Sequence, residues 1–230
     1  MVNFSLPNES LESNSNDKIK PSMKKLLTEF IGAFFVSLSV TLCLLGTVGN
    51  MAGLAIGITL MVMVFAGGHI SGGHYNPAVT LAVFIRGKCP PHEVPGYILA
   101  QLFGAALAAL VGSSFIIGKL GVGMDLSGIT AQAILCEILG SFAMCYVVLN
   151  VATTKDNVGN SFYGLAIGLT MTACAYAFGG ISGIAFNPAI ALGLGISNIS
   201  GFANIWIYWV GEIIGAVVAA FTFLYINGKD

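Results

Sequence analysis

The sequence predicts an all-α membrane protein in which six transmembrane helices and two shorter re-entrant half-helices form an inverted repeat. Three observations carry this prediction. The 230-residue chain is 56% hydrophobic and only 8% charged, with a mean hydropathy of +0.88, whereas about a quarter of the residues of a soluble domain are charged. Several apolar runs are long enough to cross a bilayer. A segment containing Asn-Pro-Ala occurs twice, which indicates an internal duplication.

The first 22 residues differ from the rest of the chain, because they are rich in Ser, Asn, Glu and Lys and contain two prolines. Such a segment buries too little apolar surface to order itself, so we expect residues 1–22 to form a disordered cytoplasmic tail. The tail lacks the apolar core of a signal peptide, and the first span is expected to direct insertion. Residues 23–226 then form one membrane domain, with repeat one at about 23–118 and repeat two at about 130–226.

Six apolar runs of membrane-spanning length are separated by polar loops. They occupy residues 23–45, 51–68, 94–117, 131–151, 161–179 and 203–226. Two further apolar runs, 77–85 and 188–196, have half that length, and each begins with a proline, which suits the first turn of a helix. We interpret these two as half-helices that re-enter from opposite sides. Their glycine-rich approaches, 67–73 and 179–183, are predicted to be irregular backbone, which membrane depth tolerates only inside protein or beside water.

The lysines and arginines orient the chain. Eight of the nine fall on one side of the predicted spans, and these are Lys18, Lys20, Lys24, Lys25, Arg86, Lys88, Lys155 and Lys229. Only Lys119 falls on the other side. Because positive residues favour the cytoplasmic face, both termini are predicted to be cytoplasmic. Three spans per repeat then require that the second copy be inverted, so the two half-helices meet near the midplane.

The two Asn-Pro-Ala segments carry the chemistry. Asn76-Pro77-Ala78 and Asn187-Pro188-Ala189 are offset by 111 residues (187 − 76). A helix N-terminus has unpaired N–H groups and roughly half a positive charge, so two N-termini aimed at one point repel cations and protons. The asparagine amides can donate to a passing water oxygen and interrupt a proton-conducting chain of waters. The pattern therefore predicts a pathway for neutral solutes.

At these residues the chain resembles the major intrinsic protein family, the aquaporins and aquaglyceroporins. The resemblance covers residues 24–226 and includes the run from His69 to Thr80, which looks like the first signature of the family. It implies the aquaporin fold, a passive channel without a cofactor, and a homotetramer with one pore per subunit. Glu29 and Glu137 stand at mirrored places in spans one and four. Because carboxylates in a bilayer need partners, we expect both to accept hydrogen bonds from backbone N–H groups of the re-entrant loops as structural support, as the resemblance also implies.

The resemblance places the narrowest point of the pathway at Ile56, Ala175, Ile184 and Ile190. The family's arginine is replaced by Ile190, and the aromatic or histidine partner common in water-selective members is absent. An aliphatic ring removes donors, and each missing hydrogen bond is worth about 1–3 kcal/mol to a passing water. Ala175 also widens the site, so polarity and size act in opposite directions.

Three further polar residues have open interpretations. His69 and His74 flank the predicted cytoplasmic approach to the first half-helix, and we interpret them as neutral vestibule residues, with a pH switch as the alternative. Glu212 occupies a position where many members of the family have proline. Its partner is expected to be either a lysine or the backbone.

The sequence thus favours a passive channel for water, with small uncharged solutes as further permeants. The alternative is a channel for glycerol, urea, ammonia or gases with low water flow, and a third hypothesis is a non-conducting membrane scaffold. An enzyme is not supported, because no metal cluster, nucleophile pair or phosphate loop occurs among the spans. A net charge of −1 gives no basic surface for nucleic acid. The expected surroundings are a lipid bilayer, most simply the cell membrane.

Overall fold

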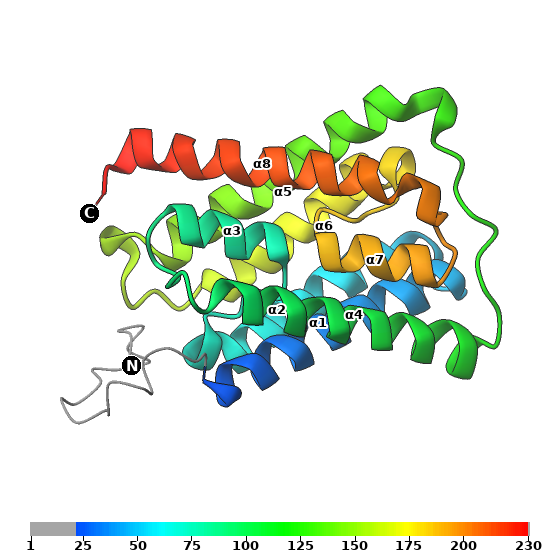
Figure 1. Cartoon of the computed structure of the whole chain (residues 1–230), viewed down its shortest axis with the longest axis horizontal. Coiled ribbons are helices and arrows are strands. Elements are labelled where there is room, and N and C mark those ends of the chain that lie inside the picture. The colour runs from blue at the N-terminus through cyan, green and yellow to red at the C-terminus, as the bar shows by residue number, and fades with distance from the viewer. Residues whose placement is uncertain (1–21, 230) are drawn as a thin grey trace.

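The computed structural model describes residues 22–229 and confirms the all-α class (Figure 1). Within that range, six helices are long and apolar enough to cross a membrane. They are α1 (Met23–Leu45), α2 (Ala52–Ser71), α4 (Val94–Leu110, continued by the π-helical segment η3, Val111–Ile117), α5 (Thr130–Ala152), α6 (Tyr163–Ser182) and α8 (Ile205–Asn227). The six predicted spans are therefore confirmed. The predicted tail lies outside the described residues, except for Ser22.

The two half-helices have the predicted bounds. They are α3 (Pro77–Ile85) and α7 (Pro188–Ile196), nine residues each, or about 14 Å at the rise of an α-helix. That length is half of the hydrocarbon thickness of a bilayer. Both lie between the long helices, one toward each end of the molecule (Figure 1).

The glycine-rich approaches are more helical than the sequence predicts. The expectation of irregular backbone is wrong for residues 67–71 and 179–182, because α2 continues to Ser71 and α6 to Ser182. Away from water the backbone must bond internally, so a helix persists through glycines that water would destabilise. The helices end where a left-handed residue closes them, at Gly72 (φ 90°) and Gly183 (φ 101°). Irregular backbone is confined to residues 72–76 and 183–187.

The long helices pack closely in mirrored pairs. Helix α1 meets α4 at Gly104, where an added Cβ would lie 2.5 Å from the carbonyl oxygen of Phe30. Helix α5 meets α8 at Gly215, where an added Cβ would lie 2.5 Å from the carbonyl oxygen of Ile138. Small residues allow such backbone contact, which gives helices in lipid their van der Waals attraction. The duplicated sequence therefore produces two equivalent helix contacts, α1 with α4 and α5 with α8.

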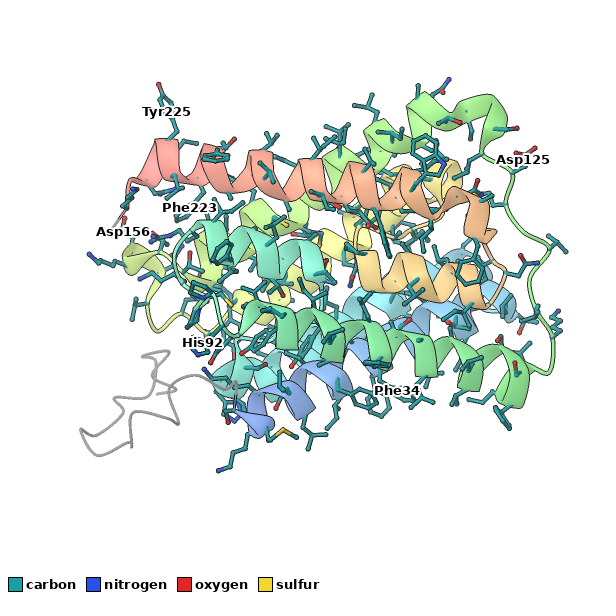
Figure 2. The ribbon with its side chains drawn as sticks, in the orientation of Figure 1. Phe34, His92, Asp125, Asp156, Phe223 and Tyr225 are labelled. Carbon is teal, nitrogen blue, oxygen red and sulfur yellow. The ribbon has the colours of Figure 1, made fainter. Side chains whose placement is uncertain are left out.

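The two ends of the molecule carry different loops. Figure 2 shows His92 and Asp156 at the end where α8 finishes, and Asp125 at the opposite end. Helix α1 starts at the same end as His92 (Figure 1). This is the end that the lysine and arginine distribution assigns to the cytoplasm.

The crossing of α1 and α4 makes a first prediction. Gly104→Ala places a methyl group against the α1 backbone, and overpacking of this kind lowers the free energy of unfolding by about 1–3 kcal/mol. Gly180→Ala is the matched control, because Gly180 lies inside α6 and an added Cβ there meets nothing within 4 Å. Thermal unfolding in detergent should show a lower Tm for the first variant only. Equal Tm values would contradict the close approach.

Candidate functional site

Each asparagine of the Asn-Pro-Ala segments caps its own half-helix. Asn76 Oδ1 accepts the N–H of Ala78 at 2.8 Å, and Asn187 Oδ1 accepts the N–H of Ala189 at 2.9 Å. Both asparagines have extended backbone, as N-cap residues do. The cap fixes each side chain so that its amide nitrogen is directed away from its own helix.

The two half-helices are bonded to each other through these amides. Asn76 Nδ2 donates to the carbonyl oxygen of Phe186 at 2.9 Å, and Asn187 Nδ2 donates to that of Tyr75 at 3.0 Å. Phe186 and Tyr75 are the residues that precede the opposite asparagine. The structure therefore brings both asparagines together at facing helix N-termini.

In the first repeat, Glu29 anchors the loop that precedes the half-helix. The carboxyl is fully buried and accepts four hydrogen bonds. The donors are Ser71 Oγ at 2.6 Å, the N–H of His74 at 3.0 Å, the N–H of Tyr75 at 2.7 Å and Gln101 Nε2 at 2.8 Å. The sequence predicts the backbone donors, but it does not reveal Ser71 or Gln101. Four donors satisfy both oxygens of an ionised carboxylate.

The second repeat uses two carboxyl groups for the same purpose. Glu137 accepts from Ser182 Oγ at 2.6 Å and from the N–H of Phe186 at 2.7 Å. Glu212 Oε1 accepts the N–H of Asn187 at 2.8 Å. Of the two partners considered for Glu212, lysine and backbone, the structure shows the backbone. Glu212 was not among the predicted site residues, yet it touches one of the central asparagines.

The residues before the asparagines have strained backbone. Tyr75 has a φ of 50° and Phe186 one of 49°, and a left-handed conformation costs a non-glycine residue about 1–3 kcal/mol. Their rings pack against Gly32 and Gly140, where an added Cβ would lie 2.1 and 2.2 Å from a ring atom. The glycines and the buried carboxylates together hold this conformation.

A small cavity of about 20 Å³ lies at the asparagine pair. A buried water needs about 10–15 Å³ by this measure, so the cavity has room for a single water. The lining residues are Val36, Leu60, Gly73, His74, Asn76, Val79, Met144, Val148, Ile167, Met171, Phe186, Asn187 and Ile190. The wall is therefore apolar apart from the two amides, one histidine and backbone groups.

Several residues that line the cavity do not belong to a recognisable sequence motif, so the motifs alone do not predict them. Val36 and Met144 stand at mirrored positions, at the same 108-residue offset as Glu29 and Glu137 (144 − 36). Leu60 pairs in the same way with Met171 at an offset of 111 (171 − 60). The repeat offset is the signal that could have found them, because an apolar side chain carries no chemical mark of its own.

A wider hollow of about 780 Å³ adjoins the small cavity and shares His74 and Val148 with it. Charged groups line this hollow, including Lys25 and Glu93, whose Nζ and Oε1 atoms lie 2.7 Å apart. Burial raises the pKa of the Cys89 thiol, also in the lining, to about 11. That thiol is protonated and unreactive at neutral pH.

The two predicted vestibule histidines both line the wider hollow. His69 is exposed in the last turn of α2. His74 Nδ1 lies 3.1 Å from Thr80 Oγ1, and the ring reaches the small cavity as well. His74 therefore lies where the small cavity and the wider hollow meet.

The four aliphatic positions, Ile56, Ala175, Ile184 and Ile190, are all buried members of one apolar cluster. Only Ile190 among them lines the small cavity. Ile184 has a φ of 63°, at the position where the first repeat has Gly73 with a φ of 62°. None of the four side chains offers a hydrogen bond.

Comparisons with known proteins agree with this geometry. The family model described as "Major intrinsic protein" matches residues 16–223. A probable aquaporin NIP-type from Nicotiana alata is 35% identical over 226 residues, covering 90% of this chain and 79% of the relative. Glycerol uptake facilitator protein-like 6 from Lactiplantibacillus plantarum is 34% identical over 218 residues, covering 90% of this chain and all of the relative. The aquaglyceroporin structure from Plasmodium falciparum shares the fold, with a TM-score of 0.68 at 20% identity over 87% of this chain and 94% of that one.

The carboxylate at the first loop makes a second prediction. Glu29→Gln keeps the shape but turns one acceptor oxygen into an NH₂ group that faces donors, so the free energy of unfolding should fall by about 2–4 kcal/mol. Glu93→Gln, which breaks the partly exposed pair with Lys25, should change it by less than about 1 kcal/mol. Thermal unfolding in detergent measures both changes. A similar loss for the two variants would contradict the anchoring role of Glu29.

Proposed function

The chain belongs to the major intrinsic protein family, whose members are passive channels and not enzymes, and we propose that it conducts water in single file, with small uncharged solutes as further permeants. One observation carries the proposal. The cavity at the asparagine pair has room for about one water, and its wall is apolar apart from the amides, one histidine and backbone groups. Such a passage admits molecules one at a time and without an energy source.

The facing half-helices supply the charge selectivity of this channel. Each helix N-terminus is equivalent to about half a positive charge, and α3 and α7 present theirs to the same point. Cations and protons are repelled there. Each Nδ2 donates one hydrogen to the opposite loop, and its second hydrogen can be donated to the oxygen of the permeant. A water held by both amides cannot pass a proton along the file.

The aliphatic ring sets the size and polarity of what passes. Ile56, Ala175, Ile184 and Ile190 form this ring in our proposal, and Glu29 and Glu137 support the loops behind it. With no arginine in the ring, the half-helix dipoles at Asn76 and Asn187 carry the exclusion of cations. His69 and His74 lie on the wider, cytoplasmic side of the passage.

A second candidate function is a channel for glycerol, urea, ammonia or gases with low water flow. The small side chain of Ala175 favours the larger solutes of this group, the absence of a donor in the ring favours apolar gases over water, and one relative of similar sequence is named a glycerol uptake facilitator-like protein. A non-conducting scaffold is the third candidate, supported by the burial of the whole ring.

We also propose the assembly and the orientation. The membrane domain spans residues 23–226 with both termini in the cytoplasm, most simply in the cell membrane. Large apolar side chains such as Phe103, Phe115 and Phe221 are exposed on the outer faces, where lipid or neighbouring subunits of a homotetramer would cover them. Water, small neutral solutes and lipid are the expected partners, with no cofactor and no nucleic acid.

Stopped-flow light scattering on proteoliposomes tests the main proposal. We expect osmotic water permeability well above that of empty liposomes, together with proton and potassium leakage at the empty-liposome level. Uptake of glycerol and urea is measured on the same vesicles. Water flow at the empty-liposome level would overturn the proposal, and solute uptake would then select the second function, whereas silence for every solute would select the scaffold.

The replaced arginine makes a further prediction. Ile190→Arg adds a charge and donors at a residue that lines the small cavity, so it should reduce glycerol and urea uptake relative to water. Ile190→Leu keeps the volume without the charge and should leave the ratio unchanged. The measured quantity is the ratio of solute to water permeability in proteoliposomes. An unchanged ratio in the arginine variant would show that this position does not line the path.

A further inference from the structure

The two loop anchors differ at one position. Gln101 of α4 and Glu212 of α8 are mirrored at an offset of 111 residues (212 − 101). Gln101 Nε2 donates to Glu29 Oε2 at 2.8 Å. Glu212 occupies the corresponding place beside Glu137, so the second repeat has a carboxyl group where the first has an amide donor.

Glu137 has one hydrogen-bond donor fewer than Glu29. Glu29 receives four hydrogen bonds, one of them from the Gln101 amide. Glu137 receives hydrogen bonds from the Ser182 hydroxyl and from the N–H groups of Phe186 and Ala185. Among residues 22–229, no donor to Glu137 corresponds to Gln101 unless Glu212 itself carries a hydrogen.

Glu212 has one oxygen that accepts and one that lacks a partner. Oε1 accepts the N–H of Asn187 at 2.8 Å. Oε2 is buried and has no hydrogen-bond partner among the described residues. A neutral carboxyl group offers one acceptor and one donor. Its carbonyl oxygen fits the Oε1 position, and its hydroxyl fits Oε2.

The two carboxyl groups are buried and bind neighbouring groups of the same loop. They bind the consecutive N–H groups of Phe186 and Asn187. Helices α5 and α8 also approach closely here, because an added Cβ on Gly211 would lie 2.7 Å from the Cβ of Glu137. Both side chains are fully buried. Two like charges that interact in a buried site disfavour each other, which favours a pair that retains one proton.

The neighbouring helices supply no compensating cation among the described residues. The titratable groups near Glu212 are Glu137 and Cys145 of α5, with Tyr208 of α8 itself, and Cys174 of α6 interacts with Glu137. Half-helices α3 and α7 contain no ionisable side chain. The guanidinium of Arg86 lies 4.9 Å from the centre of the Phe223 ring, and Phe223 is three turns further along α8, about 16 Å away.

We propose that Glu212 is a positioning residue that works as a neutral acid, holding one proton on Oε2 and donating it in a hydrogen bond to Glu137. The pair then carries a single negative charge, as Glu29 does beside Gln101. Through its other oxygen, Glu212 fixes the backbone of Asn187 and with it the start of α7. This inference deepens the proposed channel and rests on it for its functional readout, but the proton itself is measured independently.

Infrared difference spectroscopy detects the proton. The spectrum of the reconstituted native protein minus that of Glu212→Gln should contain the C=O stretch of a protonated carboxylic acid, shifted in D₂O. Gln101→Glu builds a second carboxyl pair, with Glu29, and should add a second band of this kind. A native spectrum without the band would overturn the proposal, and this outcome does not depend on whether the protein conducts water.

Permeability tests the positioning role. Glu212→Gln restores the amide of the first repeat, so water permeability should stay within about twofold of native, whereas Glu212→Leu, which can neither accept nor donate, should lower it by about tenfold or more. In the native protein, alkaline pH removes the shared proton and should lower permeability, and Glu212→Gln should not respond. Three outcomes would each overturn the positioning role. They are a folded Glu212→Gln protein that does not conduct water, a Glu212→Leu protein with native permeability, and the same pH dependence of permeability in native and Glu212→Gln proteins. A native protein silent in the flux assay would refute the proposed channel and leave the infrared result to decide the proton.

Discussion

Two buried carboxylates hold the centre of this molecule. Tyr75 and Phe186 have left-handed backbone, which costs about 1–3 kcal/mol at each residue. Glu29 offsets this with four hydrogen bonds, and bonds to a charged group contribute about 1.5–3 kcal/mol each. The hydrogen bonds exceed the strain, so the loops keep the one conformation that points each asparagine amide at the opposite loop. Without these hydrogen bonds, the loops would not be held in the conformation that places the N-termini of α3 and α7 opposite each other.

Because the loops are fixed in this way, different groups select the permeant by different properties. In the proposed channel, the helix dipoles act on the charge of the permeant, the two amides act on its orientation, and the wall acts on its size. Each of these tasks uses backbone or a neutral side chain, and the Glu29 carboxylate binds the N–H groups of His74 and Tyr75 in the loop before α3. A charged group in the path would bind a permeant too strongly for rapid release, whereas a fixed dipole attracts an oxygen without holding it.

The sequence predicts the half-helices well because proline and length act locally, and both have the predicted bounds. Glycine content misled the prediction for residues 67–71 and 179–182, since glycine breaks helices in water but not where the backbone lacks a competing partner. The donors Ser71 and Gln101 and the partner of Glu212 were out of reach, because they depend on how helices from distant parts of the chain cross. Apolar wall residues such as Met144 carry no motif, and only the repeat offset marks them.

In the proposed channel, the aliphatic ring selects by polarity as well as by size. A water that loses one hydrogen bond in the ring meets a barrier of about 1–3 kcal/mol, or about a 5- to 150-fold slower passage. Glycerol has three hydroxyl groups, and a ring without donors or acceptors leaves several of them unpaired at once, so the cost of lost hydrogen bonds is larger for glycerol than for water. Ammonia loses fewer bonds than glycerol, and an apolar gas loses none. For the proposed ring, the cost of lost hydrogen bonds therefore ranks water above glycerol, and it is smallest for apolar gases.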